Sequence, residues 1–180
     1  DTISLTASYN ANNNYEVTVE NGILTIINSS ENAVNAIGQS VVYDGKKYGL
    51  KEVSSLRPES TLLYSTDNVT FSENLPTFTE AGTYTVYVKA TNPNYNETPV
   101  VEGTVVISKR EIAITAASAE KRYDGNDLTA PTAEITSGTL AEGQTLESVT
   151  VAGSQKTTGT SANVASNAVI RAGDADVTAN

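Results

Sequence analysis

Residues 80–88 read Glu80-Ala81-Gly82-Thr83-Tyr84-Thr85-Val86-Tyr87-Val88. The side chains of a β-strand point alternately to the two faces of a sheet. In this stretch one face would carry Tyr84, Val86, Val88 and Ala90, and the other would carry Thr85, Tyr87 and Lys89. The alternation predicts a strand with one face in a hydrophobic core and the other toward solvent.

The position of Tyr84 narrows the fold class. In immunoglobulin-like (Ig-like) sandwiches a tyrosine precedes a core cysteine by two residues, and its hydroxyl bonds to the backbone at the corner of the sheets. Here Tyr84 precedes Val86 by two residues, so that Val86 takes the place of the cysteine. The spacing predicts an all-β, Ig-like β-sandwich in which Tyr84 and Val86 are structural residues.

Two motifs recur 80 residues apart. Tyr43-Asp44-Gly45 returns as Tyr123-Asp124-Gly125, and Asn12-Asn13-Asn14-Tyr15 returns as Asn92-Pro93-Asn94-Tyr95. A shared period of this length indicates tandem units. We expect residues 1–27 to be the terminal strand segment of a preceding repeat, 28–108 a complete Ig-like repeat, and 109–180 a second Ig-like repeat without its last strand. In that second repeat the stretch 158–163 aligns with the Tyr84 region but contains no tyrosine.

The remaining local signals are turns and one short helix. Asp44-Gly45 and Asp124-Gly125 are predicted to form tight turns, because glycine tolerates positive φ and aspartate can bond its own backbone. A helix is predicted over residues 31–37, with Ser30 as its N-cap and Gly38 as its end. The alternative fold is a β-grasp-like mixed α/β repeat, which needs a substantial helix in each unit.

Composition excludes several classes of protein. The chain has 180 residues, of which 38% are hydrophobic, a net charge of −10, and no Cys or His. Disulfides, zinc sites built on Cys or His, and Ser-His or Cys-His nucleophiles are therefore excluded. The acidic balance argues against nucleic acid as a partner. No stretch approaches about 18 apolar residues, so that no membrane insertion is expected.

The motifs together resemble those of a known group. The Tyr-Asp-Gly motif, residues 78–86, and an Asn-Tyr motif followed by a Gly-x-Leu/Val-x-Ile strand resemble MBG/YDG-type bacterial Ig-like tandem repeats. Those last strands are Gly22-Ile23-Leu24-Thr25-Ile26 and Gly103-Thr104-Val105-Val106-Ile107. The resemblance covers nearly the whole chain and rests on structural motifs. It implies a Gram-positive cell-surface adhesin in which such repeats form extracellular, wall-anchored stalks or adhesive modules.

The candidate catalytic residues are Asp44 and Asp124. Glycosidase chemistry needs two carboxylates within about 10 Å of each other, whereas these two fall in separate repeats 80 residues apart. The turn interpretation is favoured. We therefore expect a chain that is not an enzyme, with no catalytic residue and no cofactor.

Two other kinds of site have candidate residues in the sequence, a calcium site and an isopeptide crosslink. Asp174, Asp176 and Asn180 offer the oxygen ligands that calcium prefers, but the run lacks the glycine and distal glutamate of an EF-hand loop. A solvated hairpin tip is favoured, and no metal site is expected. An internal Lys–Asn isopeptide bond from Lys89 or Lys109 needs a buried, desolvated lysine beside an acid, and the alternation places Lys89 on the outer face.

The resemblance therefore implies a structural and adhesive protein outside the cell, at the bacterial cell surface. Tyr87, on the outer face of its strand, is the candidate contact for a host or matrix glycoprotein or glycan. The alternatives are a carbohydrate-binding or spacer module of a secreted glycan-degrading enzyme and a crosslinked pilin-like shaft.

A sandwich without its last strand has an unpaired edge, and residues 12–27 have the sequence of that strand. The chain is thus expected as a monomer or as head-to-tail strand-exchanged chains.

Overall fold

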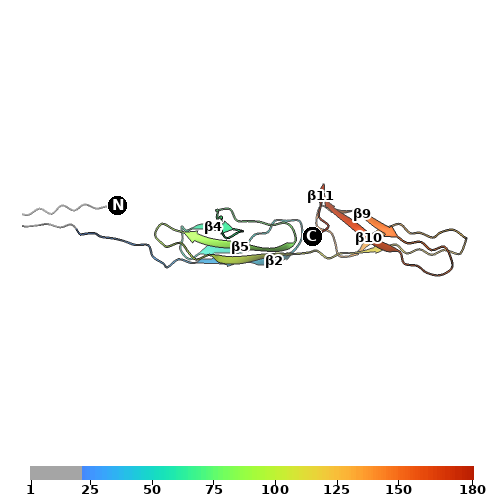
Figure 1. Cartoon of the computed structure of the whole chain (residues 1–180), viewed down its shortest axis with the longest axis horizontal. Helices are drawn as coiled ribbons and strands as arrows, with labels where there is room; N and C mark the ends of the chain where they lie inside the picture. The colour runs from blue at the N-terminus through green and yellow to red at the C-terminus, as the bar shows by residue number, and fades with distance from the viewer. Residues whose placement is uncertain (1–21) are drawn as a thin grey trace, which may run out of the picture.

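The computed structural model describes residues 22–180, which form eleven β-strands and no helix. The predicted all-β class is confirmed. Most of the predicted terminal strand segment, residues 1–27, lies outside the described residues, and only residues 22–27 of it are described. The strands gather in two groups along the long axis of the molecule (Figure 1). We refer to residues 28–108 as the N-terminal half and to residues 109–180 as the C-terminal half.

The N-terminal half holds two sheets. Its strands are β1 (Val34–Ile37), β2 (Gln39–Val42), β3 (Glu52–Ser55), β4 (Thr61–Ser65), β5 (Gly82–Thr91) and β6 (Val101–Ser108). Four of them form a sheet in the order β2-β6-β5-β4, and β1 pairs with β3. Strand β2 runs parallel to β6, and the other neighbours are antiparallel. Because β1 also packs against β5 and β6, the arrangement is consistent with a β-sandwich.

The hydrophobic core of the N-terminal half is built from the two central strands. Val86, Val88 and Ala90 of β5 and Val105 of β6 are fully buried, and Ile107 is nearly so. Tyr43 and Leu50 also belong to this cluster, and Val177 of the C-terminal half joins it. The predicted buried face of β5 is confirmed, since every second residue from Val86 is buried. The other face is less open than predicted, because Thr85, Tyr87 and Lys89 are half-buried. Each fully buried Val or Ile contributes roughly 1.5–3 kcal/mol through the removal of apolar surface from water.

The C-terminal half has a much smaller core. Its strands are β7 (Ala113–Ala116), β8 (Ala133–Ser137), β9 (Gln144–Ala152), β10 (Val164–Ala172) and β11 (Ala175–Asp176). They form a three-stranded sheet in the order β11-β10-β9 and a pair of β7 with β8. Only Ala141 and Val177 are buried in residues 109–180. This half therefore has little hydrophobic burial of its own.

The predicted helix over residues 31–37 is wrong, because β1 occupies residues 34–37. Val34 and Ala36 are half-buried while Asn35 and Ile37 are exposed, which is the two-residue period of a strand. Gly38 is not a helix end either. The chain passes at Gly38 from the sheet that contains β1 to the sheet that contains β2. A Cβ atom on residue 38 would lie only 2.1 Å from the carbonyl oxygen of Thr104 in β6, so that glycine is needed at this position. The described residues therefore offer no helix for the β-grasp alternative.

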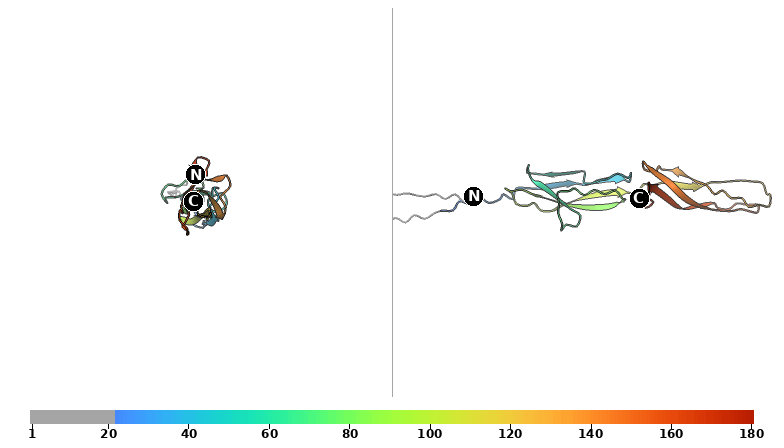
Figure 2. Two further views of the ribbon diagram at one scale, coloured as in Figure 1. Left: turned by 90° about the vertical axis from the view of Figure 1, so that its right-hand side faces the viewer. Right: turned by 90° about the horizontal axis from the view of Figure 1, so that it is seen from above.

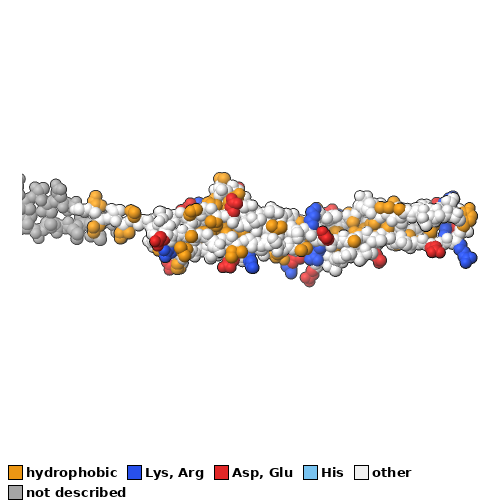
Figure 3. Space-filling view, turned by 90° about the horizontal axis from the view of Figure 1, so that it is seen from below, with side chains coloured by type: hydrophobic (Ala, Val, Ile, Leu, Met, Phe, Trp, Pro, Cys, Tyr) orange, Lys and Arg blue, Asp and Glu red, His pale blue; other side chains and the backbone are white. Residues whose placement is uncertain are grey.

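Residues 22–27 extend from the N-terminal half on the side away from the C-terminal half (Figures 1 and 2). Their large side chains are almost completely exposed, as at Leu24 (93%) and Ile26 (100%). Figure 3 shows hydrophobic side chains along this segment, next to the grey residues. No helix in residues 22–180 is long and apolar enough to cross a lipid bilayer.

Candidate functional site

Several long-range polar contacts join the two halves where they meet. Arg110 follows β6 directly, and its Nε donates to the Tyr43 carbonyl oxygen at 2.8 Å. Its guanidinium also contacts the backbone and hydroxyl oxygens of Thr139 at 3.4 Å. The Gln144 side-chain amide donates to the Tyr43 hydroxyl at 2.9 Å. Tyr43 is only 3% exposed, because residues from both halves cover it.

Asn180 adds a second set of contacts across this junction. Its side-chain oxygen accepts from the Ala81 backbone N–H at 2.8 Å, and its amide nitrogen donates to the Glu80 carboxylate. Val177 packs into the same hydrophobic cluster as Tyr43. The gap left between the halves has a volume of about 10 Å³, which is no more than a single water needs. The two halves are thus joined by close packing as well as by the chain.

The two Tyr-Asp-Gly motifs form equivalent turns. The Asp44 carboxylate accepts from the Lys46 backbone N–H at 3.0 Å, and the Asp124 carboxylate accepts from the Asn126 backbone N–H at 2.9 Å. Gly45 and Gly125 have φ of 81° and 79°, a conformation that favours glycine. Each aspartate is held within its own turn.

The surroundings of the two aspartates lower both pKa values. The backbone N–H of Lys46, followed by the Tyr48 hydroxyl, lowers the pKa of Asp44, and the same hydroxyl contact raises the pKa of Tyr48. For Asp124 the main cause of the lowered pKa is the hydrogen bond from Lys121, at 2.8 Å. The turns differ in exposure, because Tyr43 is 3% exposed and Tyr123 is 69% exposed. Only the first turn is covered by a neighbouring half.

Tyr84 and Val86 lie where β5 begins beside the junction. The Tyr84 hydroxyl donates to the Glu80 carbonyl oxygen at 2.9 Å, and its ring stacks on Phe78 with centroids 4.0 Å apart. Val86 is fully buried. The tyrosine therefore ties the loop before β5 to the sheet by a hydrogen bond and by ring stacking.

Tyr87 lies in the middle of the four-stranded sheet, opposite Ser65 of β4 and Glu102 of β6, and is half-buried. Lys89, two residues on, has its ammonium 3.0 Å from the Glu97 carboxylate and 4.4 Å from the centre of the Phe71 ring. The structure thus gives Lys89 a carboxylate and an aromatic ring as neighbours. A cation over an aromatic face contributes roughly 0.5–1 kcal/mol at such a site.

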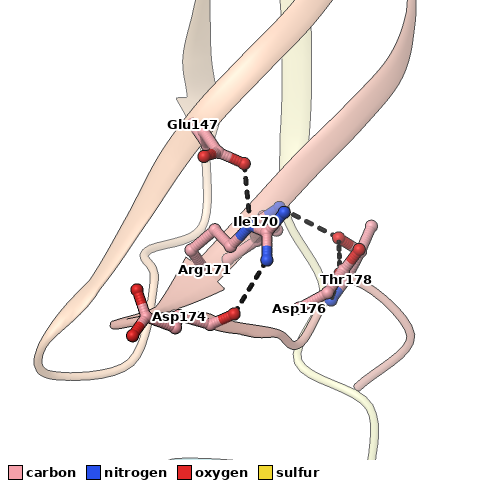
Figure 4. Close-up of polar contacts among 6 residues, drawn as sticks. All are labelled: Glu147, Ile170, Arg171, Asp174, Asp176 and Thr178. Atoms are coloured by element: carbon pink, nitrogen blue, oxygen red, sulfur yellow. Dashed lines mark hydrogen bonds and ion pairs between the residues drawn. The ribbon is translucent and has the colours of Figure 1, made fainter.

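The residues considered for calcium have other partners (Figure 4). The Asp176 carboxylate accepts from the hydroxyl of Thr178 and from its backbone N–H, and these bonds lower the pKa of Asp176. The Asp174 carbonyl oxygen accepts from Arg171, whose guanidinium also pairs with Glu147 at 2.7 Å. Asn180 points to the N-terminal half, as described above. Residues 22–180 contain no group of three acidic side chains placed to hold a metal ion.

The C-terminal half contains an open groove that no pattern in the sequence predicted. The groove has a volume of about 570 Å³ and lies between residues 116–130 and residues 153–163. The Asn163 side chain crosses this region, and its amide nitrogen donates to the carbonyl oxygens of Ala117 and Ala130, both at 2.8 Å. Its side-chain oxygen is buried without a partner among the described residues.

Asp67, in the turn after β4, has the largest pKa shift among the described residues. The Asp67 carboxylate accepts from the Ser65 hydroxyl at 2.7 Å and from the backbone N–H groups of Val69 and Thr70, both at 2.8 Å. These bonds, the Ser65 hydroxyl first, lower the pKa of Asp67 from 3.8 to about 2. Such a carboxylate stabilises the folded state only while it is ionised.

The Asp67 turn gives a pH-dependent prediction. Because the pKa of Asp67 is lower in the folded chain, the unfolded chain binds more protons between pH of about 4 and about 2. The free energy of unfolding should therefore fall as the pH drops through this window. The Asp67→Asn variant should be less stable than the parent chain at neutral pH. Its free energy of unfolding should also decrease less as the pH drops through this window.

Urea unfolding followed by circular dichroism at several pH values measures this effect. The matched control is Asp127→Asn, since no hydrogen bond to the Asp127 carboxylate occurs in the described part of the chain. An Asp67→Asn variant with the same pH slope as the parent chain would contradict the prediction.

Comparisons of the chain with models of protein families, with curated proteins and with solved structures found no significant match.

Proposed function

We propose that the chain is a non-catalytic structural and adhesive repeat region of a bacterial cell-surface protein. In this proposal residues 28–108 and 109–180 are two tandem Ig-like units that act as an extracellular stalk. The observation that carries it is the junction, where Arg110 and Gln144 bind Tyr43 and Asn180 binds the loop before β5. A stalk needs units that keep their alignment, and contacts of this kind limit bending between them.

Local structure supports the Ig-like assignment. The Tyr84 hydroxyl bonds to a backbone oxygen four residues upstream, as in the tyrosine corner of Ig-like sandwiches. The equivalent turns at Asp44 and Asp124 support a tandem repeat. So do two equivalent bridges, which pair Tyr48 with Phe78 and Leu128 with Gln155. Tandem units stacked end to end extend a surface protein from the cell.

The stiffness of the junction can be tested in the intact chain. The chain has no Cys, so that spin labels can be placed on exposed strand positions by Thr104→Cys and Ser148→Cys. We expect pulsed electron resonance to give a narrow distance distribution between the labels. The additional Arg110→Ala and Gln144→Ala substitutions should broaden it, because each lost hydrogen bond removes about 0.5–1.5 kcal/mol of stabilisation.

The control for this experiment is Arg122→Ala, which removes an exposed arginine away from the junction and should leave the distribution narrow. A distribution that is already broad in the labelled parent chain would contradict a stiff stalk. A distribution unchanged by the double substitution would show that the named contacts do not set the alignment.

The adhesive part of the proposal concerns the outer face of the four-stranded sheet. Tyr87 offers an aromatic side chain there, suited to a glycan or to a host or matrix glycoprotein. Saturable binding of the chain to mucin, matrix proteins or a glycan panel, lost in Tyr87→Ala, would support an adhesive face. Binding to none of them would leave only the stalk function of the proposal.

The alternative, a carbohydrate-binding or spacer module of a secreted glycan-degrading enzyme, predicts binding to polysaccharide and a catalytic domain in the flanking sequence.

A further inference from the structure

Three stretches of the chain have the form Asn-x-Ser/Thr, in which x is not proline. They are Asn28-Ser29-Ser30, Asn68-Val69-Thr70 and Asn96-Glu97-Thr98. Such a triplet is the acceptor motif for N-linked glycosylation, which adds a bulky, solubilising group to a surface residue. Because the motif is short, its place in the fold decides whether it can be used. The structure presents the three triplets differently.

The triplet at Asn96 has a buried hydroxyl. Thr98 is only 4% exposed, and its hydroxyl oxygen accepts from the Ala90 backbone N–H at 2.9 Å. The motif requires the hydroxyl of its third residue, and a transferase cannot reach this one unless the chain opens beside β5. In the folded chain Asn96 is therefore a poor acceptor.

The triplet at Asn28 is held against the loop between β5 and β6. The Asn28 side-chain amide donates to the Tyr95 carbonyl oxygen at 3.4 Å. The backbone N–H of Ser29 donates to Asn94 at 3.1 Å, and its carbonyl oxygen accepts from Asn96 at 2.8 Å. The amide that would be modified and the middle residue of the triplet are thus both engaged with that loop.

The triplet at Asn68 lies in the turn after β4, which projects from the side of the N-terminal half (Figure 1). Asn68, Val69 and Thr70 are all exposed, Val69 by 81%. Within residues 22–180 no hydrogen bond to the side-chain amide of Asn68 occurs. This triplet therefore presents its amide and its hydroxyl-bearing residue to solvent together.

The conformation of this turn is fixed by the residue before Asn68. The Asp67 carboxylate binds the Ser65 hydroxyl and the backbone N–H groups of Val69 and Thr70. Asn68 itself has a φ of 58°, which asparagine tolerates better than most residues. The turn is thus held in one conformation without the help of the side chain that would be modified.

We propose that Asn68 is an acceptor site for N-linked glycosylation and that the fold selects it over Asn28 and Asn96. In the reaction a bond forms between the anomeric carbon of a sugar and Nδ2 of Asn68. The bond from that carbon to the phosphate oxygen of an activated glycosyl phosphate donor breaks, and the phosphate leaves with the electron pair. One amide proton passes to a base of the transferase. This modification is independent of the stalk and adhesive roles proposed above.

A glycan on Asn68 would lie beside the edge of the four-stranded sheet. Strand β4 pairs with β5 on one side. On its other side, within the described residues, the backbone of β4 pairs only at Tyr64, with Ser72. Strand edges with unpaired backbone groups can pair with another chain. A bulky group a few residues before Ser72 would hinder that approach.

The test uses the intact, folded chain with a purified asparagine glucosyltransferase and UDP-glucose. Short peptides with the three triplet sequences give the reference rates, because the fold is absent from them. Trypsin separates the triplets, since Arg57 and Lys89 lie between them, and mass spectrometry then measures the hexose added to each. Relative to the peptides, we expect Asn68 to react at least about tenfold faster than Asn96, which must wait for local opening.

Two matched variants separate the motif from the turn. Thr70→Val removes the hydroxyl with little change of shape and keeps the backbone N–H that binds Asp67, so that modification of Asn68 should be lost. Thr70→Ser keeps a hydroxyl and should keep the modification. Because Thr70 is exposed, both variants should retain the melting temperature of the parent chain.

Three outcomes would overturn the proposal. The folded chain could remain unmodified while the peptide with the Asn68 triplet reacts, which would show that the turn does not present the amide. Asn28 or Asn96 could react as fast as Asn68 relative to the peptides, which would show that the fold does not select. Modification of Asn68 could also persist in Thr70→Val, which would show that the motif is not what the transferase reads.

Discussion

Replacing Gly38 with alanine is expected to lower the free energy of unfolding by at least about 3 kcal/mol. The added Cβ would lie 2.1 Å from the Thr104 carbonyl oxygen and 3.0 Å from the Thr104 carbonyl carbon and nitrogen. These are backbone atoms of β6, a central strand, so that no side-chain rotation relieves the clash. Overpacking of a well-packed site costs about 1–3 kcal/mol, and more where backbone must move.

Urea unfolding of the parent chain and of Gly38→Ala measures this effect. If the two proteins have the same m-value, a difference in their midpoints reports a difference in stability. Gly22→Ala is the matched control, because nothing lies within 4 Å of the position of its Cβ. That substitution should change the free energy of unfolding by no more than about 0.5 kcal/mol. Similar results for the two variants would show that β1, β2 and β6 do not meet as described.

Replacing Ile107 with alanine is expected to lower the free energy of unfolding by about 3 kcal/mol. Ile107 is 2% exposed and belongs to the buried hydrophobic cluster of the N-terminal half. Truncation of a buried isoleucine to alanine costs about 2–5 kcal/mol, because apolar contacts are lost and a cavity remains. Much of the hydrophobic burial of the described chain is concentrated in this cluster, so that few other contacts can compensate.

Val42→Ala is the control for Ile107, because Val42 lies on the neighbouring strand β2 and is 53% exposed. Its truncation should cost less than about 1 kcal/mol. Thermal and urea unfolding followed by circular dichroism distinguish the two results. An Ile107→Ala variant as stable as Val42→Ala would mean that the core is not centred on β5 and β6.

The part of the fold that the sequence predicts correctly depends on local patterns. The alternation of β5 predicts its buried face, because a strand must place every second side chain on the same side. Asp44 with Gly45 and Asp124 with Gly125 have the residue types that a tight turn requires, and the structure has turns at both places. These patterns need no knowledge of distant residues.

The failed helix prediction shows where local patterns mislead. Ser30, Glu31 and Gly38 carry the signals of a helix start and end, yet residues 34–37 pair with β3. Gly38 is needed for the close approach of β6, which comes more than 60 residues later in the chain. Pairing with a distant strand outweighs weak helix propensity over so short a segment.

The junction and the groove could not be predicted from the sequence. Tyr43 is 67 residues from Arg110 and 101 residues from Gln144, and no periodic pattern links them. The groove depends on how residues 116–130 lie beside residues 153–163, and no local pattern encodes that placement. The signal that could have found Arg110 is its place directly after the last strand of a repeat, where the next unit must begin.

The parallel pairing of β2 with β6 has a mechanical consequence. The chain enters the N-terminal half at the end where Ser29 meets Tyr95 and leaves it after Ser108 at the other end. A force pulling on these two points drives β2 and β6 in opposite directions along their length. Their ladder, from Gln39 with Val105 to Val42 with Ser108, is then loaded in shear, and its hydrogen bonds must break together rather than one after another. A half built in this way resists extension far better than its modest size suggests, which suits a molecule under tension.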